Sequence, residues 1–400
     1  MPSETSDRQS ADSAGWFRRR IVPYLPYPHF MALGPIDSVL RMLIRARFAV
    51  PWQYWPRLAF LLVASTVATI VTLPERLAIN AWMRWRPRPI APHEAPVFVL
   101  GYFRSGTTYL QTLLSLDPAL RTPRWIEALV PHTFVVDWTI ARAVLFPFLP
   151  LVRIGKVMPL APTLPAEDDF ALSIWGLTSI MSGRLVLPSQ QRFYNRYHDL
   201  DSLTPAERAE WESYQRAFVE KLMLTSGGRR LVLKSPSHTA RVRHLLRLFP
   251  GAKFVHISRP PEKVFQSNMA LIEETQGSFR LQHSLPADEQ EEIVVDEYLA
   301  TEKHYLADKR LIPPGDLSEV RLQDLAADPV GELRRIYGEI GLPFSTEHES
   351  RIRRLLAAPR QRTPLEHGAL SPAQAERTAR LAPLAEAFGH DRPTIPKAGA

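Results

Sequence analysis

The chain contains 400 residues, carries a formal net charge of +8 and has no cysteine. Hydrophobic residues make up 45% of it and charged residues 22%, which indicates a globular protein and excludes collagen-like, coiled-coil and mostly disordered chains. The absence of cysteine excludes disulfides, cysteine-ligated zinc, iron–sulfur clusters and a thiol nucleophile.

The positive charge is concentrated at the start of the chain. Residues 1–100 contain 12 arginines, no lysine and six acidic residues, a net charge of +6, whereas the other 300 residues carry only +2. The same hundred residues hold five of the nine tryptophans. Arginine and tryptophan beside an apolar run are typical of a membrane interface. We therefore expect residues 40–90 to contact a membrane surface, and we expect no nucleic-acid partner.

The first predicted elements precede the main domain. Residues 1–20 are polar and are expected to form a disordered N-terminus, and residues 21–90 are expected to be helical. The run LAFLLVASTVATIVTL at 58–73 has no charge and would form a helix about 24 Å long, shorter than the ~30 Å hydrocarbon core of a bilayer. Pro56 and Pro74 are expected to limit its length. A buried core helix, a helix inserted shallowly in one leaflet and a membrane span remain open as interpretations.

A proline-rich linker at 86–96 leads into the main domain, which we expect at 95–390 with a tail at 391–400. Short apolar β-rich runs alternate there with segments of helical periodicity, which predicts an α/β fold with a central parallel sheet flanked by helices. The strands are expected at 95–101, 229–236, 252–260 and 319–322. A loop followed by a helix is expected within 103–116, and further helices at 238–249 and from Asp328-Pro329 to Gly341.

The first strand is followed by a glycine loop, GYFRSGTT at 101–108. Two glycines at this spacing, after a strand and before a helix, are typical of a phosphate-binding loop, because backbone N–H groups and the helix N-terminus point at the anion. The lysine that normally follows the second glycine is replaced by Thr107, and Arg104 places a positive charge inside the loop. The loop therefore suits a shorter anion than a triphosphate, although an ordinary glycine turn has the same pattern.

A second candidate anion site follows the third strand. Arg259 lies just after that strand, and Ser267 lies eight residues later on the next helix. An arginine at a strand end and a serine on the following helix can converge on one phosphate.

These motifs together resemble those of the PAPS-dependent sulfotransferases, and of their bacterial and tyrosylprotein-type members more than the cytosolic type. FRSGTTYL resembles the 5′-phosphosulfate loop, SRPPEKVFQSN the 3′-phosphate segment and LVLKSPSHTARVRHLLRLF the lysine-containing strand and helix between them. The resemblance covers 95–390 and implies one P-loop domain related to nucleotide kinases. It also implies PAPS as co-substrate without a metal, held by Arg104, Ser105, Gly106, Thr107, Thr108, Arg259 and Ser267.

Sulfuryl transfer needs a cation at the bridging oxygen and a base for the acceptor proton. Lys234, at the end of the second strand, is our candidate for the cation, and Arg104 is the second. The resemblance makes Glu127 the first candidate for the base, so that Glu127→Gln is expected to abolish turnover without preventing PAPS binding. His238, four residues after Lys234, is the second candidate base, and the acidic pair Asp168 and Asp169 is the third.

The sequence thus predicts a cytoplasmic enzyme, at the cytoplasmic face of the inner membrane if the N-terminal segment docks there. It moves a sulfuryl group from PAPS to a hydroxyl or amine of a small-molecule or lipid acceptor, with PAP as product. Two other classes stay open. One is a kinase or ATPase, which shares the loop geometry, and the other is a non-catalytic membrane-associated scaffold of the same fold.

Overall fold

The computed structural model describes residues 29–85, 90–135, 162–358 and 369–390. The expected disordered N-terminus and tail lie outside these ranges. Five parallel strands form one sheet in the order β2-β3-β1-β4-β5, which confirms the α/β fold with a central parallel sheet. The strands are β1 (Val97–Leu100), β2 (Leu120–Arg121), β3 (Arg230–Lys234), β4 (Lys253–Ser258) and β5 (Leu317–Arg321).

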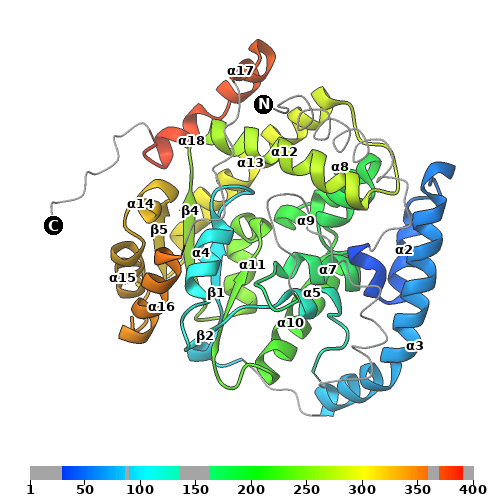
Figure 1. Ribbon diagram of the computed structural model, residues 1–400, viewed down its shortest axis with the longest axis horizontal. Helices are drawn as coiled ribbons and strands as arrows, with labels where there is room; N and C mark the ends of the chain where they lie inside the picture. Colours follow the sequence, from blue (N-terminus) through cyan, green and yellow to red (C-terminus); the bar gives the residue numbers. More distant parts are fainter. Residues whose placement is uncertain (1–28, 86–89, 136–161, 359–368, 391–400) are drawn as a thin grey trace, which may run out of the picture.

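Helices cover both faces of the sheet, as Figure 1 shows. Their bounds are α2 (Ile36–Arg45), α3 (Trp55–Trp85), α4 (Thr107–Leu114), α5 (Trp125–Leu129), α7 (Asp168–Gly176), α8 (Gln191–Tyr194), α9 (Arg196–Asp199), α10 (Pro205–Leu224), α11 (Val242–Leu248), α12 (Pro261–Phe279), α13 (Ala287–Asp308), α14 (Leu322–Ala327), α15 (Pro329–Glu339), α16 (Thr346–Ala357), α17 (Pro372–Ala379) and α18 (Ala382–Ala387). Short 3-10 turns include η2 (Phe30–Leu33) and η8 (Pro236–Arg241).

Alternate residues of the central strand β1 enter two different cores. Val97 and Val99 pack in a cluster with α4, α15 and α16, whereas Phe98 and Leu100 belong to a larger cluster on the other face. A strand buried on both faces reads as a continuous apolar run, which is why this strand was recognisable in the sequence. Strand β2 has only two residues, too few for any pattern, and the sequence did not predict it.

The N-terminal helices pack on the domain. Phe30, Met42 and Leu61 belong to the same hydrophobic cluster as Phe98 of β1. Helices α2 and α3 lie side by side along the edge of the molecule opposite α15 and α16 (Figure 1). The segment that we expected to be helical is therefore joined to the α/β body through a shared core.

Helix α3 is longer than the sequence indicated. It runs through Pro74 and has 31 residues, about 46 Å, so the expectation that this proline limits the helix was wrong. Pro56 lies in the first turn, where proline is tolerated. Contacts on both sides of Pro74 hold the helix together: Thr72 Oγ1 is 3.2 Å from His132 Nε2, and Glu75 accepts a 2.9 Å hydrogen bond from Val135 N.

The last predicted helix is confirmed as α15. The Asp328 carboxylate accepts a 3.0 Å hydrogen bond from Gly331 N and so caps the helix start, and Pro329 is its first residue. Gly341, with a φ of 65°, follows the helix end in the left-handed region.

Candidate active site

The glycine loop connects the carboxyl end of β1 to the start of α4. Both of its glycines have positive φ angles, 137° at Gly101 and 110° at Gly106. A Cβ at Gly101 would lie 2.4 Å from Ile257 O and 2.6 Å from Ser105 Oγ, and one at Gly106 would lie 2.7 Å from a methyl group of Leu322. Both positions therefore need glycine for backbone conformation and for space.

The loop has the features of an anion-binding site. Helix α4 begins at Thr107, immediately after Gly106, so its N-terminal N–H groups point toward the loop. The hydroxyl Oγ of Ser105 is buried and has no hydrogen-bond partner among the described residues. A buried hydroxyl without a partner is costly, and a phosphate or sulfate oxygen would satisfy it.

The second predicted anion site lies beside this loop. The Arg104 Nε donates a 2.8 Å hydrogen bond to Ser267 Oγ on α12, and Arg259 Nη1 donates a 3.3 Å hydrogen bond to Arg104 O. Arg104 has a φ of 70°, a conformation that is uncommon for residues other than glycine. Three residues from three separate segments, singled out from the sequence, thus meet at one place.

Arg259 lacks an acidic partner. Burial lowers the pKa of its guanidinium, and no carboxylate in the described part of the chain forms an ion pair with it. The phenol of Tyr298 opposes that effect only in part. A half-buried arginine of this kind favours a bound anion.

Lys234 is the last residue of β3 and pairs in register with Val99 of β1. Its side chain is buried, and Nζ lies 2.5 Å from Glu167 Oε1 and donates a 3.3 Å hydrogen bond to Thr108 Oγ1. The lysine therefore sits against the first turn of α4, as the prediction of a catalytic cation requires. Its carboxylate partner was not among the residues that the sequence had suggested.

Glu167 directly precedes α7 and is the residue that sequence reasoning missed. One of its oxygens faces Lys234, and the other, Oε2, is buried without a hydrogen-bond partner among the described residues. The backbone bridge between Arg124 and Pro165 holds the segment before α7 in place. The signal was present in the string Glu167-Asp168-Asp169, but nothing in the sequence distinguished the three acids.

Both carboxylate oxygens of Glu127 have hydrogen-bond partners. Its Oε1 lies 2.5 Å from Arg121 Nη2 and 2.7 Å from Arg124 Nη2, and its Oε2 accepts a 2.8 Å hydrogen bond from Arg124 N. The side chain is buried and closes the first turn of α5 as a capping box. Because both oxygens already accept hydrogen bonds, this geometry argues against Glu127 as the base.

The other candidate bases are enclosed in the fold. His238 Nε2 lies 2.8 Å from Asp168 Oδ2, and neither side chain is exposed. The imidazole also makes an edge contact with Phe98 of β1. Asp169 pairs with Arg241 at 2.9 Å; burial alone would raise the pKa of this carboxyl, but the arginine lowers it. These groups are buried and pair with one another inside the fold, although His238 Nδ1 has no hydrogen-bond partner among the described residues.

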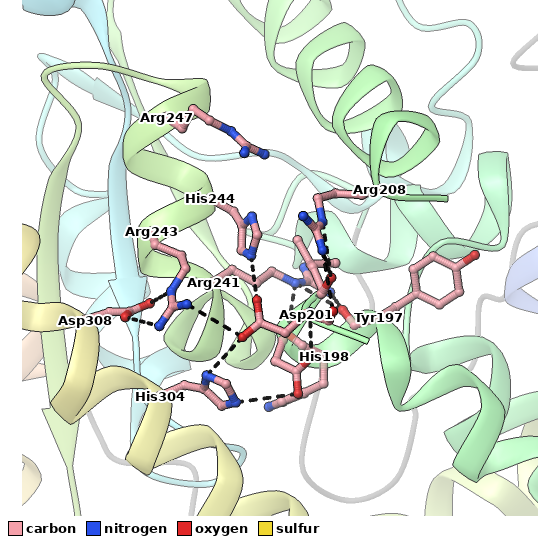
Figure 2. Close-up of polar contacts among 12 residues, drawn as sticks. Tyr197, His198, Asp201, Arg208, Arg241, Arg243, His244, Arg247, His304 and Asp308 are labelled. Atoms are coloured by element: carbon pink, nitrogen blue, oxygen red, sulfur yellow. Dashed lines mark hydrogen bonds and ion pairs between the residues drawn. The ribbon is translucent and has the colours of Figure 1, made fainter. Parts of the chain in front are cut away.

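Another polar cluster lies between α9, α11 and α13, as Figure 2 shows. Arg243 Nη2 is 2.6 Å from Asp308 Oδ1, and His244 Nε2 is 3.2 Å from Asp201 Oδ1. His304 Nδ1 approaches the same Asp201 at 3.8 Å. Arg243, His244 and His304 each face a carboxylate, and the cluster joins the end of α9 to α11 and α13. The described part of the chain contains no group of three or more residues suited to hold a metal ion.

Fold and site together define a class of protein. A parallel sheet with a glycine loop after β1, a lysine at the end of β3 and an arginine after β4 is typical of P-loop-like α/β proteins, a class that binds anionic groups at the carboxyl edge of the strands. The lysine that normally follows the second glycine in a P-loop NTPase is absent.

Comparisons with known proteins give the family. The model of the Sulfotransferase family matches residues 163–346. Two curated relatives, from Mycobacterium bovis and Mycobacterium tuberculosis, are both named omega-hydroxy-beta-dihydromenaquinone-9 sulfotransferase Stf3. Each is 30% identical over 318 residues, which is 80% of this chain and 80% of the relative. The chain belongs to the sulfotransferase family.

Solved structures agree on the fold. Sulfotransferase STF9 from Mycobacterium avium matches with a TM-score of 0.62 and 23% identity, covering 81% of this chain and 85% of that one. Sulfotransferase STF1 from Mycobacterium tuberculosis matches with a TM-score of 0.58 and 20% identity, covering 87% of this chain and 93% of that one. Because the chain belongs to the sulfotransferase family, the kinase and ATPase interpretation is not favoured.

Proposed function

We propose that the protein transfers a sulfuryl group from PAPS to a hydroxyl group on a largely apolar, lipid-like acceptor. The observation that carries the proposal is Arg259, a half-buried cation without a carboxylate partner among the described residues, beside Arg104 and Ser267. A second anion site next to the phosphate loop suits a nucleotide with two separate anionic groups. PAPS has such a pair, a 3′-phosphate and a 5′-phosphosulfate.

The residues present fit this donor. The loop from Gly101 to Thr108 would hold the 5′-phosphosulfate through the N-terminus of α4 and the unpartnered Ser105 hydroxyl. Arg259 and Ser267 would hold the 3′-phosphate, which distinguishes PAPS from ADP and ATP. PAPS supplies the activated sulfuryl group, and everything else in the step falls to side chains of this chain.

Transfer forms one bond and breaks another. The acceptor oxygen bonds to sulfur while the bond from sulfur to the bridging phosphate oxygen breaks, which leaves PAP and a sulfate ester. Lys234 neutralises the charge that develops on the departing phosphate oxygen. Glu167 accepts the acceptor's proton. Glu167 pairs with Lys234, and a bound anionic donor would compete for that lysine and release the carboxylate.

We therefore assign the base to Glu167 in preference to Glu127 and His238. Glu167 has one carboxylate oxygen without a hydrogen-bond partner and lies against the proposed catalytic cation. Both oxygens of Glu127 are held by Arg121 and Arg124, and His238 is enclosed with Asp168.

The acceptor class rests on the relatives. Their name gives an omega-hydroxylated dihydromenaquinone as the molecule that they sulfate. We extend to this chain only the shared chemistry, a hydroxyl on a molecule that is otherwise apolar.

The test is incubation of the purified protein with PAPS and a total lipid extract, followed by mass spectrometry. We expect a new lipid heavier by one SO₃ group, formed together with PAP and absent with Lys234→Met. No product from PAPS, or phosphorylated product from ATP with magnesium, would contradict the proposal.

A further inference from the structure

The outward face of α3 carries the apolar residues of the helix. Residues 55, 59, 63, 66, 70, 73 and 77 are all exposed and recur every three or four positions, which places them in one stripe along the helix. The stripe contains no charged residue: it consists of Trp55, Ala59, Val63, Thr66, Ile70, Leu73 and Leu77. Val63, Ile70 and Leu77 are 60%, 67% and 62% exposed.

The inward face of the same helix carries charge. Arg57 is buried and donates a 2.9 Å hydrogen bond to Arg280 O, and Glu75 is buried and accepts from Val135 N. A helix at a water-exposed surface places its charged residues outward and its apolar residues inward. Helix α3 shows the reverse at these positions, which indicates that its outer face does not meet water.

Exposed large hydrophobic side chains gather on this part of the molecule. Among the described residues, 15 such side chains are exposed, and all but Phe193, Leu311, Leu355 and Leu356 lie between Leu40 and Trp85. They include Leu40, Ile44 and Phe48, spaced four apart on and just after α2, which packs beside α3. An apolar surface that extends over two neighbouring helices marks an interaction site.

The residues at the ends of α3 and the local charge indicate what kind of partner covers this apolar surface. Trp52 and Trp55 are exposed at its start, and Trp82 and Trp85 at its end. Tryptophan is enriched at the level of lipid headgroups, where its ring meets hydrocarbon and its N–H meets water. Apart from the buried Arg57 and Glu75, residues 36–85 contain five arginines and one acidic residue, which suits an anionic lipid surface.

We propose that the outer faces of α2 and α3 form a docking surface for a lipid bilayer, with α3 lying in the plane of the interface. By length and composition, the segment Trp52–Met83 is the one candidate for a membrane span among the described residues. Spanning would pull Arg57, Thr72 and Glu75 from their partners in the body of the protein. An in-plane orientation leaves these contacts intact and buries only the apolar stripe.

The docking surface is joined to the proposed reacting centre by α7. Ser38 Oγ and Arg41 Nη2 of α2 donate hydrogen bonds of 2.7 Å and 3.1 Å to Trp175 O near the end of α7. The other end of this nine-residue helix, about 13 Å away, follows Glu167. The reacting centre would then lie one short helix away from the docked side. This consequence rests on the proposed function, whereas vesicle binding itself does not.

The first experiment is cosedimentation of the full chain with vesicles of phosphatidylcholine containing phosphatidylglycerol. We expect binding, and we expect the triple variant Val63→Glu, Ile70→Glu, Leu77→Glu to bind at least about tenfold more weakly. The matched control is Leu311→Glu with Leu355→Glu, two exposed residues outside the surface, which should bind as the native chain does. Retained donor-induced thermal stabilisation shows that the triple variant is folded.

Three outcomes would overturn the proposal. The native chain could stay in the supernatant, or the triple variant could bind vesicles as well as the native chain. The native chain could also form a dimer that the triple variant loses, with neither binding vesicles, in which case a second copy covers the face.

The orientation of α3 has its own test. Because the chain has no cysteine, Ile70→Cys supplies a single thiol for an environment-sensitive fluorophore. Quenching by lipids labelled at different depths should place the fluorophore about 5–10 Å below the headgroups. A position at the bilayer centre would show a spanning helix and contradict the in-plane arrangement.

Discussion

Two groups of charged side chains differ in how their charges are balanced. In the cluster that joins α9, α11 and α13, Arg243 meets Asp308 and His244 meets Asp201 (Figure 2). At the carboxyl edge of the sheet, Arg259 has no carboxylate partner within the described residues. Lys234 pairs with Glu167, whose second carboxylate oxygen has no hydrogen-bond partner among those residues. The first group is complete without a ligand, whereas the second is not.

This difference separates charged groups that hold the fold together from charged groups that bind a ligand. Ion pairs in which each cation has a carboxylate partner fix the position of α9, α11 and α13. Their loss should lower the free energy of unfolding. Cations that burial disfavours, and that no acid compensates, are stable only if something else supplies the negative charge. We therefore expect changes in one group to affect folding and changes in the other to affect binding and turnover.

The largest expected effect on stability comes from Arg241→Met, next to the balanced cluster. It leaves the fully buried Asp169 without its ion-pair partner, so the free energy of unfolding should fall by about 3–5 kcal/mol. Urea denaturation measures it, and the protein that remains folded should keep its turnover. An Arg241→Met variant as stable as the native chain would contradict the claim that these ion pairs stabilise the fold.

Lys234→Met should have the largest effect on turnover. Removing the cation from the departing phosphate oxygen should lower kcat by about 10³-fold, measured by PAP release. Arg243→Met serves as the control because this arginine lies in the balanced cluster, and its kcat should be unchanged. Equal kcat in Lys234→Met and the native chain would contradict the assignment.

Glu167→Gln should lower kcat by about 10²-fold through loss of the base, while PAP binds as tightly as before or more tightly. Tighter binding is expected because Glu167 no longer competes for Lys234. Glu127→Gln is the matched comparison. It should lower the melting temperature by releasing Arg121 and Arg124, with a smaller loss of kcat. A larger loss of kcat in Glu127→Gln than in Glu167→Gln would show that Glu127 is the base.

A smaller, pH-dependent effect is expected at Lys221, a buried lysine outside both groups. Burial lowers its pKa from 10.5 to about 7; Glu75 opposes this shift and Arg76 adds to it. Between these two pH values the unfolded chain binds the proton and the folded chain releases it, so stability rises with pH across this window. Relative to Lys221→Met, the native melting temperature should therefore rise from about pH 7 to pH 9. A difference in melting temperature between the two proteins that does not change with pH would contradict the lowered pKa of Lys221.

Much of the fold and site could be predicted because the responsible signals are local. A glycine loop between a strand and a helix, and an arginine after the next strand, are contiguous patterns. Arg104, Arg259 and Ser267 could thus be named from the sequence, and the structure brings them together. Strand β1 was recognisable because both of its faces are buried.

The rest depended on contacts between segments distant in sequence. Glu167 could be separated from Asp168 and Asp169 only by knowing that it lies against Lys234, 67 residues later. Helix α3 continues past Pro74 because residues near 132–135 hold it on both sides. Neither contact can be predicted from the local sequence pattern.

The most direct test of the account is a calorimetric titration of the native chain and of Arg259→Met with PAP and with ADP, which lacks the 3′-phosphate. If the unbalanced arginine forms a 3′-phosphate site, the native chain should bind PAP at least about tenfold more tightly than ADP, a difference of about 1.4 kcal/mol. Arg259→Met should lose most of that preference and keep its affinity for ADP. Equal affinity of the native chain for the two nucleotides, or a preference that survives in Arg259→Met, would contradict the account.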